Sequence, residues 1–143
     1  MMEKRLANAD DIPDLVALRK RQLTDEGLPP IIAEIDQHLA DYFASAMADG
    51  SFVAWVMEAE DKIIATGGIC FYALPPTFSN PTGRVAYITN MYTQEEYRRN
   101  GIATELLSAA MCEAKTRGYK IIRLHASEEG KPIYRKAGFT DSN

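Results

Sequence analysis

A run from residue 85 to residue 117 constrains the fold most, because it joins a strand pattern, a short basic loop and a helix pattern. Residues 85–93 form an apolar run that is typical of a strand. From residue 102 onward, apolar side chains recur at helical spacing, while charged side chains fall off that stripe. The stripe consists of Ile102, Leu106, Ala109, Ala110 and Ala114. The pattern predicts a strand, a loop and then a long helix that Gly118 closes.

The loop that precedes this helix has the features of an anion-binding site. The first turn of a helix leaves backbone N–H groups unpaired and carries partial positive charge. Gly101 lets a ligand approach the backbone closely, and Ala103 keeps the next turn bare. Arg98 and Arg99 add mobile positive charge beside these amides. The loop lacks the Gly-Lys-Ser/Thr of a P-loop and the three glycines of a dinucleotide fingerprint, but its position predicts that a phosphate group binds there.

Composition excludes several other classes. The 143 residues are enough for one domain, and the net charge of −4 disfavours nucleic acid or an anionic membrane as the main partner. Cys70 and Cys112 lie in apolar runs and are predicted to be buried thiols, neither a disulfide nor a metal pair. No Cys/His cluster has metal-ligand spacing, so no metal is predicted. No apolar run approaches the roughly 20 residues of a membrane span and the start is no signal peptide, so we expect a cytoplasmic location.

The remaining segments complete the predicted order β-α-α-β-β-β-α-β-α. The first segments are a strand over 2–6, a helix that Asn8 or Asp10 caps and that breaks at 27–30, and a helix over 31–48. A hairpin follows, with strands 52–58 and 63–73 and a turn at 60–62, and then a loop over 74–83. After the long helix come a strand over 120–126 and a helix of about two turns that Gly138 ends. This order predicts a mixed sheet with helices on both faces and a right-handed parallel crossover at its end. Strand 85–93 is predicted to be central, and its buried polar groups then need partners or a ligand in a gap.

Three segments together resemble the GNAT superfamily of N-acetyltransferases. They are Asn-Met-Tyr-Thr at 90–93, Arg-Arg-Asn-Gly-Ile-Ala at 98–103 and Tyr-Arg-Lys-Ala-Gly-Phe at 134–139. The resemblance covers essentially the whole chain and implies an α/β fold with a GNAT-like, mostly antiparallel central sheet, a splayed parallel strand pair and helices on both faces. It implies one acetyltransferase domain over residues 1–143. That domain would lack a full C-terminal strand, because only four residues follow Phe139.

The resemblance also implies how acetyl-CoA, the expected cosubstrate, is held. Backbone amides of the loop would bind the pyrophosphate, and the main chain of 91–93 would pair with the pantetheine arm like an added strand. The residues carried over are Met91, Tyr92, Thr93, Arg98, Arg99, Asn100, Gly101, Ile102, Ala103, Thr104 and Ser127. Ser127 stands where the family often has Asn, seven residues before the tyrosine. Its hydroxyl offers fewer hydrogen-bonding groups than an amide.

The implied reaction is direct acetyl transfer from acetyl-CoA to a primary amine of a small molecule or a peptide. The amine must first lose a proton, since an alkyl ammonium has a pKa of about 10.4 and no lone pair. A backbone N–H near Met91 would stabilise the oxyanion. Tyr134 would act as the general acid toward the departing thiolate. The general base is open among His125, Glu26 and Glu34.

Acidic residues near the first two helices would favour a cationic acceptor. They are Asp25, Glu26, Glu34, Asp36 and Asp41. The alternative is a CoA-binding or structural module without turnover. Tyr134 favours turnover, whereas the lack of Asp or Glu in strand 85–93 argues against it. The exposed edge of strand 120–126 would favour a homodimer, with no membrane or nucleic-acid partner.

Overall fold

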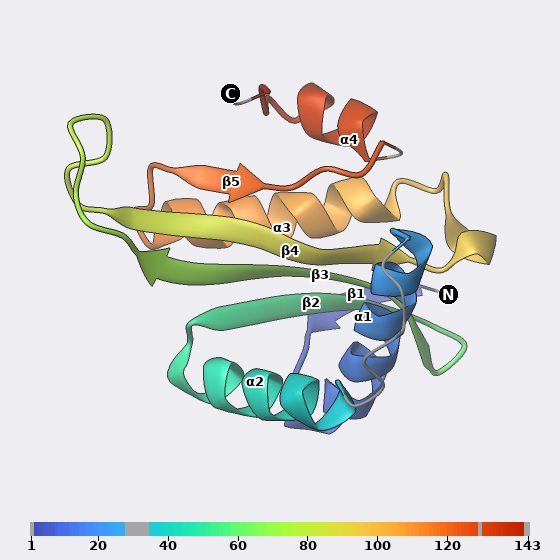
Figure 1. The fold of residues 1–143 in the computed structure, drawn as a ribbon. Helices are drawn as coiled ribbons and strands as arrows, with labels where there is room; N and C mark the ends of the chain where they lie inside the picture. Colours follow the sequence, from blue (N-terminus) through green and yellow to red (C-terminus); the bar gives the residue numbers. More distant parts are fainter. Residues whose placement is uncertain (1, 28–34, 129, 142–143) are drawn as a thin grey trace.

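One mixed sheet organises the residues that the computed structural model describes, namely 2–27, 35–128 and 130–141 (Figure 1). The strands, in spatial as well as chain order, are β1 (Met2–Leu6), β2 (Phe52–Ala59), β3 (Lys62–Ala73), β4 (Arg84–Thr93) and β5 (Ile122–Leu124). The first four strands pair antiparallel with their neighbours, while β4 and β5 pair in parallel. This arrangement confirms the predicted mixed sheet and its parallel crossover through helix α3 (Ile102–Thr116).

Helices cover both faces of the sheet, as predicted. Helices α1 (Ile12–Asp25) and α2 (Asp36–Asp49) lie on one face and α3 lies on the other (Figure 1). The short helix α4 (Lys131–Lys136) lies beyond β5. In the described residues, no helix is long and apolar enough to cross a membrane.

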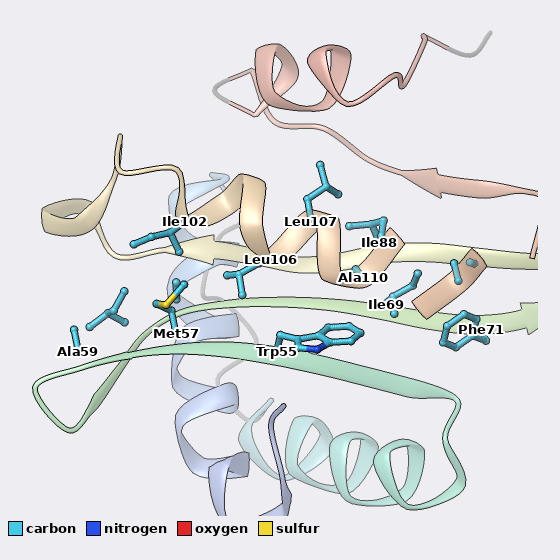
Figure 2. Close-up of a cluster of buried hydrophobic side chains, with 14 residues drawn as sticks. Trp55, Met57, Ala59, Ile69, Phe71, Ile88, Ile102, Leu106, Leu107 and Ala110 are labelled. Atoms are coloured by element: carbon cyan, nitrogen blue, oxygen red, sulfur yellow. The ribbon is translucent and has the colours of Figure 1, made fainter. Parts of the chain in front are cut away.

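The apolar face of α3 is anchored in the larger of two core clusters. Leu106 and Leu107 are at most 1% exposed and belong to one cluster with side chains of the sheet such as Trp55 and Ile69 (Figure 2). Full burial of a leucine contributes about 1.5–3 kcal/mol. The second cluster joins α1 and α2 to β2 through side chains such as Leu15, Phe43 and Phe52. Because α3 is fixed in this way, the loop at its start is held in place relative to β4.

Asn8, one of the two predicted caps, opens the first helical segment. Its side chain accepts a hydrogen bond from the Asp10 N–H at 2.9 Å, and the Asp11 carboxylate accepts one from the Asn8 N–H at 2.8 Å. This capping box begins a 3₁₀ turn, η1 (Ala9–Asp11), that leads into α1. Arg5 of β1 donates to both Asp11 oxygens at 2.8 and 2.9 Å and also contacts Glu58, which ties the first strand to the helix.

The hairpin between β2 and β3 turns through Glu60 and Asp61 alone. Both residues have positive φ, 53° and 64°, as a two-residue type I′ turn requires. The predicted hairpin is therefore confirmed, with Lys62 already in β3. At the end of α2, Gly50 is left-handed with a φ of 81°, which confirms the predicted helix stop.

Several sequence-based predictions are corrected. Strand 120–126 shrinks to β5, because it pairs with β4 only opposite Ala86–Ile88 before the two strands diverge. β4 is next to the sheet edge, and the central strand is β3. Cys112 is exposed and Cys70 is half-buried, so neither is a core thiol. The predicted break at 27–30 and the predicted helix start at 31 extend into residues 28–34, which lie outside the described residues.

Candidate active site

The site begins with a bulge in β4. Thr66 of β3 pairs with Tyr92 and Gly68 pairs with Thr89, so Asn90 and Met91 together oppose Gly67. Asn90 has a φ of 57°, a left-handed conformation that an asparagine tolerates better than most residues. A bulge bends and twists its strand. β4 leaves β5 just before this point, and no described strand pairs with that edge of β4 beyond Ile88.

A cavity of about 180 Å³ lies where the two strands separate. Residues 87–91 of β4 line one side of it. Leu124, His125 and Ser127 line the side of β5 and its continuation, and Tyr134 of α4 adds its ring. Helix α1 contributes Arg19 and Gln22, and its C-cap residue Glu26 adds a third polar side chain. The cavity therefore combines the unpaired edge of β4 with titratable groups from three other segments.

Asn90 supplies an unpaired donor in this cavity. The side chain is 4% exposed, and its amide nitrogen Nδ2 has no hydrogen-bond partner among the described residues. A buried polar group without a partner costs about 1–3 kcal/mol. The sequence predicted that buried polar groups of this strand need partners or a ligand in a gap, and the Asn90 amide nitrogen has no partner among the described residues. Such a donor suits the carbonyl or carboxyl oxygen of a ligand.

The loop before α3 forms a row of unpaired amides. In the described part of the chain, the backbone N–H groups of residues 99–104 donate no hydrogen bond. Arg99 and Gly101 are both left-handed, with φ values of 69° and 76°. A Cβ added at Gly101 would meet no atom within 4 Å, so the space beside the helix start is open. Alternating backbone conformations of this kind present successive N–H groups to an anion, so the loop fits a phosphate group.

Arg98 departs from the expectation that both arginines of the loop are mobile charges. Arg98 is held in place, because its Nε donates to the Thr93 carbonyl at 2.8 Å and its guanidinium lies 3.6 Å from the Asp25 carboxylate. The Tyr92 hydroxyl donates to the same carboxylate at 2.8 Å. These contacts tie the end of α1 to the end of β4. Arg99 is exposed beside the row of amides.

Tyr134 is half-buried and lines the cavity, and its hydroxyl forms no hydrogen bond with any described residue. Burial raises the pKa of Tyr134, and the negative charge of Glu26 raises it further. The hydroxyl is therefore protonated at neutral pH. A Cβ added at Gly130 would come within 2.7 Å of the Tyr134 ring, so a glycine is needed there. Ser127 lies alongside, and its Oγ accepts a hydrogen bond from the Gly130 N–H at 3.1 Å.

Two of the acidic residues predicted to favour a cationic acceptor, Asp25 and Asp36, form ion pairs within the protein. Asp25 binds Tyr92 and Arg98, as described above. Asp36 pairs with Lys20 at 2.7 Å, and Asp41 accepts from the Gln37 amide at 2.7 Å. Glu34 lies outside the described residues. Among the described members of that set, Glu26 is the one that lines the cavity.

Comparison with known proteins identifies the family. Residues 50–141 match the model of the acetyltransferase (GNAT) domain. The chain belongs to the GNAT acetyltransferase family. It is an acyltransferase, and acetyl-CoA is the cosubstrate of acetyltransferases of this family. No curated protein matches the sequence.

Solved structures agree with this GNAT assignment over the whole chain. A predicted acetyltransferase from Clostridium acetobutylicum, crystallised with acetyl-CoA, is 48% identical with a TM-score of 0.94 over 100% of this chain and 92% of that one. A GCN5-related N-acetyltransferase from Ralstonia eutropha JMP134 is 30% identical and has a TM-score of 0.91. The match covers 99% of this chain and 94% of that one. The fold is shared with glucosamine-6-phosphate N-acetyltransferase from Arabidopsis thaliana, which is 20% identical and has a TM-score of 0.75. That match covers 100% of this chain and 94% of the other.

The sequence did not point to three polar residues of the cavity, namely Arg19, Gln22 and Tyr87. Tyr87 lines the same cavity as Tyr134. Burial raises the pKa of Tyr87 as well. Arg19 lines it from α1. The sequence offered one signal for the α1 residues. Arg19, Gln22 and Glu26 are spaced three and four residues apart, which puts three polar side chains on one face of the predicted helix.

The structure brings some predicted residues into the cavity and leaves others outside it. The predicted residues that line the cavity are Met91, Ser127, Tyr134 and the base candidates Glu26 and His125. Residues 98–104 and the side chains of Tyr92 and Thr93 lie outside it. In the described residues, no group of three or more His, Cys, Asp or Glu side chains gathers where a metal could bind.

Proposed function

We propose that this chain transfers the acetyl group of acetyl-CoA directly to a primary amine of a small molecule or a peptide. The observation that carries the proposal is the cavity between the diverging strands β4 and β5. It joins an unpaired strand edge to the protonated hydroxyl of Tyr134 and to the carboxylate of Glu26. The relative from Clostridium acetobutylicum, whose structure contains acetyl-CoA, supports the choice of donor.

The pyrophosphate of CoA would lie on the amides of residues 99–104. Six consecutive N–H groups at a helix start, without an acceptor in the described part of the chain, suit a doubly charged diphosphate. Arg99 would add its exposed charge, while Arg98 would position the loop through Thr93 and Asp25. The loop residues thus bind mainly through their main chain.

The pantetheine arm would pair with the free edge of β4 at residues 91–93. An amide-bearing arm can satisfy backbone groups there in the manner of an added strand. The Thr93 carbonyl already accepts from Arg98 but keeps a second lone pair. The Ser127 hydroxyl accepts from Gly130 and can still donate to the arm.

Tyr134 would protonate the departing thiolate. The raised pKa of Tyr134 keeps its proton available at neutral pH, and its hydroxyl donates to no described residue. The thioester supplies an activated acetyl group. Glu26 and His125 both line the cavity and are the candidates that take the proton of the acceptor ammonium. Separate Glu26→Gln and His125→Gln variants distinguish them, because loss of the base alters the pH dependence of kcat.

The test has a binding part and a turnover part. Calorimetry measures CoA and acetyl-CoA binding, and similar affinities are expected because the pyrophosphate loop contacts the part common to both. Release of free thiol from acetyl-CoA is then measured with polyamines, amino acids, aminoglycosides and peptides. Binding without acetyl transfer to any amine would support the alternative of a CoA-binding module. Absence of binding would overturn the proposal.

A further inference from the structure

Three polar side chains of α1 form a charged stripe along the wall of the cavity. Arg19, Gln22 and Glu26 lie three and four residues apart, so they share one face of the helix. Gln22 links the other two, because Arg19 Nη1 donates to its Oε1 at 3.4 Å and its Nε2 donates to Glu26 Oε2 at 3.2 Å. The stripe therefore runs from a positive end at Arg19 to a negative end at Glu26.

The positive end of the stripe is not neutralised within the described protein. Arg19 is half-buried and forms no ion pair with any described residue, in contrast to Arg5, Arg98 and Arg117. Its hydrogen bond to Gln22 is long, which marks it as weak. Arg19 and Tyr87 line the same cavity.

The negative end lies beside the acid of the proposed reaction. The charge of Glu26 contributes to the raised pKa of Tyr134, after the larger contribution of burial. The same cavity is lined by Asn90, whose buried amide nitrogen has no hydrogen-bond partner among the described residues. A ligand that fills this space must offer oxygen atoms to donors and a cationic nitrogen to Glu26.

We propose that the acceptor amine also carries a carboxylate, which Arg19 binds while the amine lies toward Glu26 and Tyr134. The class is an amino acid or a short peptide. The inference rests on the proposed acetyl transfer. In that transfer, the amine nitrogen forms a bond to the acetyl carbon as the carbon–sulfur bond breaks, the base takes the proton of the amine and the thiolate receives one from Tyr134.

A carboxylate fits better than a phosphate for two reasons. Among the described residues, Arg19 is the one arginine or lysine that lines the cavity, so it balances a single negative charge. Its planar guanidinium also matches a carboxylate through two parallel hydrogen bonds. A phosphate monoester carries close to two charges at neutral pH and would remain partly unneutralised.

The test compares matched acceptors with and without the carboxylate. Glycine, leucine, β-alanine, 4-aminobutyrate and glycylglycine are each set against their carboxamides, and glucosamine 6-phosphate represents phosphates. For wild type we expect the carboxylate member to have the higher kcat/KM by on the order of 10-fold or more, the scale of one charge-assisted hydrogen bond.

Variants of Arg19 test whether this residue causes the preference. Arg19→Gln should remove the preference for the carboxylate member, and Arg19→Lys should restore part of it. Arg21→Gln on the same helix, outside the cavity, changes the same charge and should leave the preference unchanged.

A second readout needs no turnover. Backbone NMR shifts around α1 and β4 are followed during titration with leucine and with leucinamide, in wild type and in Arg19→Gln. Preferential binding of leucine that disappears in the variant supports the proposal. If carboxamides or glucosamine 6-phosphate are better acceptors, or if no carboxylate is acetylated while acetyl-CoA binds, the carboxylate inference is overturned and acetyl-CoA binding still stands. If acetyl-CoA itself does not bind, the proposed function fails first.

Discussion

Replacing Gly101 by valine tests the loop before α3, because the structure supplies a matched control at the other end of the same helix. Gly101 and Gly118 are both left-handed, with φ values of 76° and 82°. A Cβ added at either position would meet no atom within 4 Å. The row of unpaired amides lies at Gly101 and not at Gly118, whose N–H donates to the Lys115 carbonyl.

The magnitude follows from this comparison. A left-handed conformation costs an L-residue about 1–2 kcal/mol, and a branched side chain more, so both variants should lose the same stability. The melting temperature should fall by about 2–4 °C for each kcal/mol lost. At Gly101 alone, the side chain would also displace a phosphate from the amides. Loss of one charge-assisted hydrogen bond, about 1.5–3 kcal/mol, corresponds to a weakening of CoA binding by about 10-fold or more.

Calorimetric titration of CoA into wild type, Gly101→Val and Gly118→Val provides the assay, with thermal unfolding as the control for strain. The expected result is equal destabilisation of both variants and weakened CoA binding in Gly101→Val alone. Unchanged CoA affinity in a folded Gly101→Val protein, or equal loss of affinity in both variants, would refute the assignment of the loop to phosphate binding.

Three further outcomes are expected. Tyr134→Phe should keep CoA affinity and lower kcat by about 10²–10³; unchanged turnover, with chemistry limiting, would reduce the residue to a packing role. Gly130→Ala should push the Tyr134 ring aside and lower kcat while CoA affinity holds, because the new Cβ would come within 2.7 Å of the ring. The hydrogen bonds from Arg5 lower the pKa of Asp11, so its stabilisation is present above the ordinary pKa of 3.8 and fades as the pH falls below it. Urea unfolding should therefore show a deficit in Asp11→Asn that is larger at pH 7 than at pH 3; an equal deficit at both would contradict this.

Local sequence signals were enough to predict the elements that frame the site. Helix α3 followed from its apolar spacing, and Gly101 marked its start. The turn at Glu60 and Asp61 followed from a short polar break between two strand patterns. These features depend on residues that are close together along the chain, so the sequence displays them directly.

Features that depend on contacts between distant segments were missed. The bulge at Asn90 and the early end of β5 arise from how β4 packs between β3 and β5, and no local pattern encodes that. The tether of Arg98 to Asp25 joins residues 73 positions apart in the sequence. The placement of Arg19 opposite β4 likewise needed the packing of α1 on the sheet. The acceptor side of the cavity was therefore the least predictable part of the site.

A crystal structure of the protein with bound CoA tests the central claim most directly. The account predicts that the pyrophosphate lies on the amides of residues 99–104 and that the pantetheine arm pairs with the edge of β4 at residues 91–93. The thiol should then end in the cavity within hydrogen-bonding distance of the Tyr134 hydroxyl. CoA bound elsewhere on the protein, or a thiol remote from Tyr134, would contradict it.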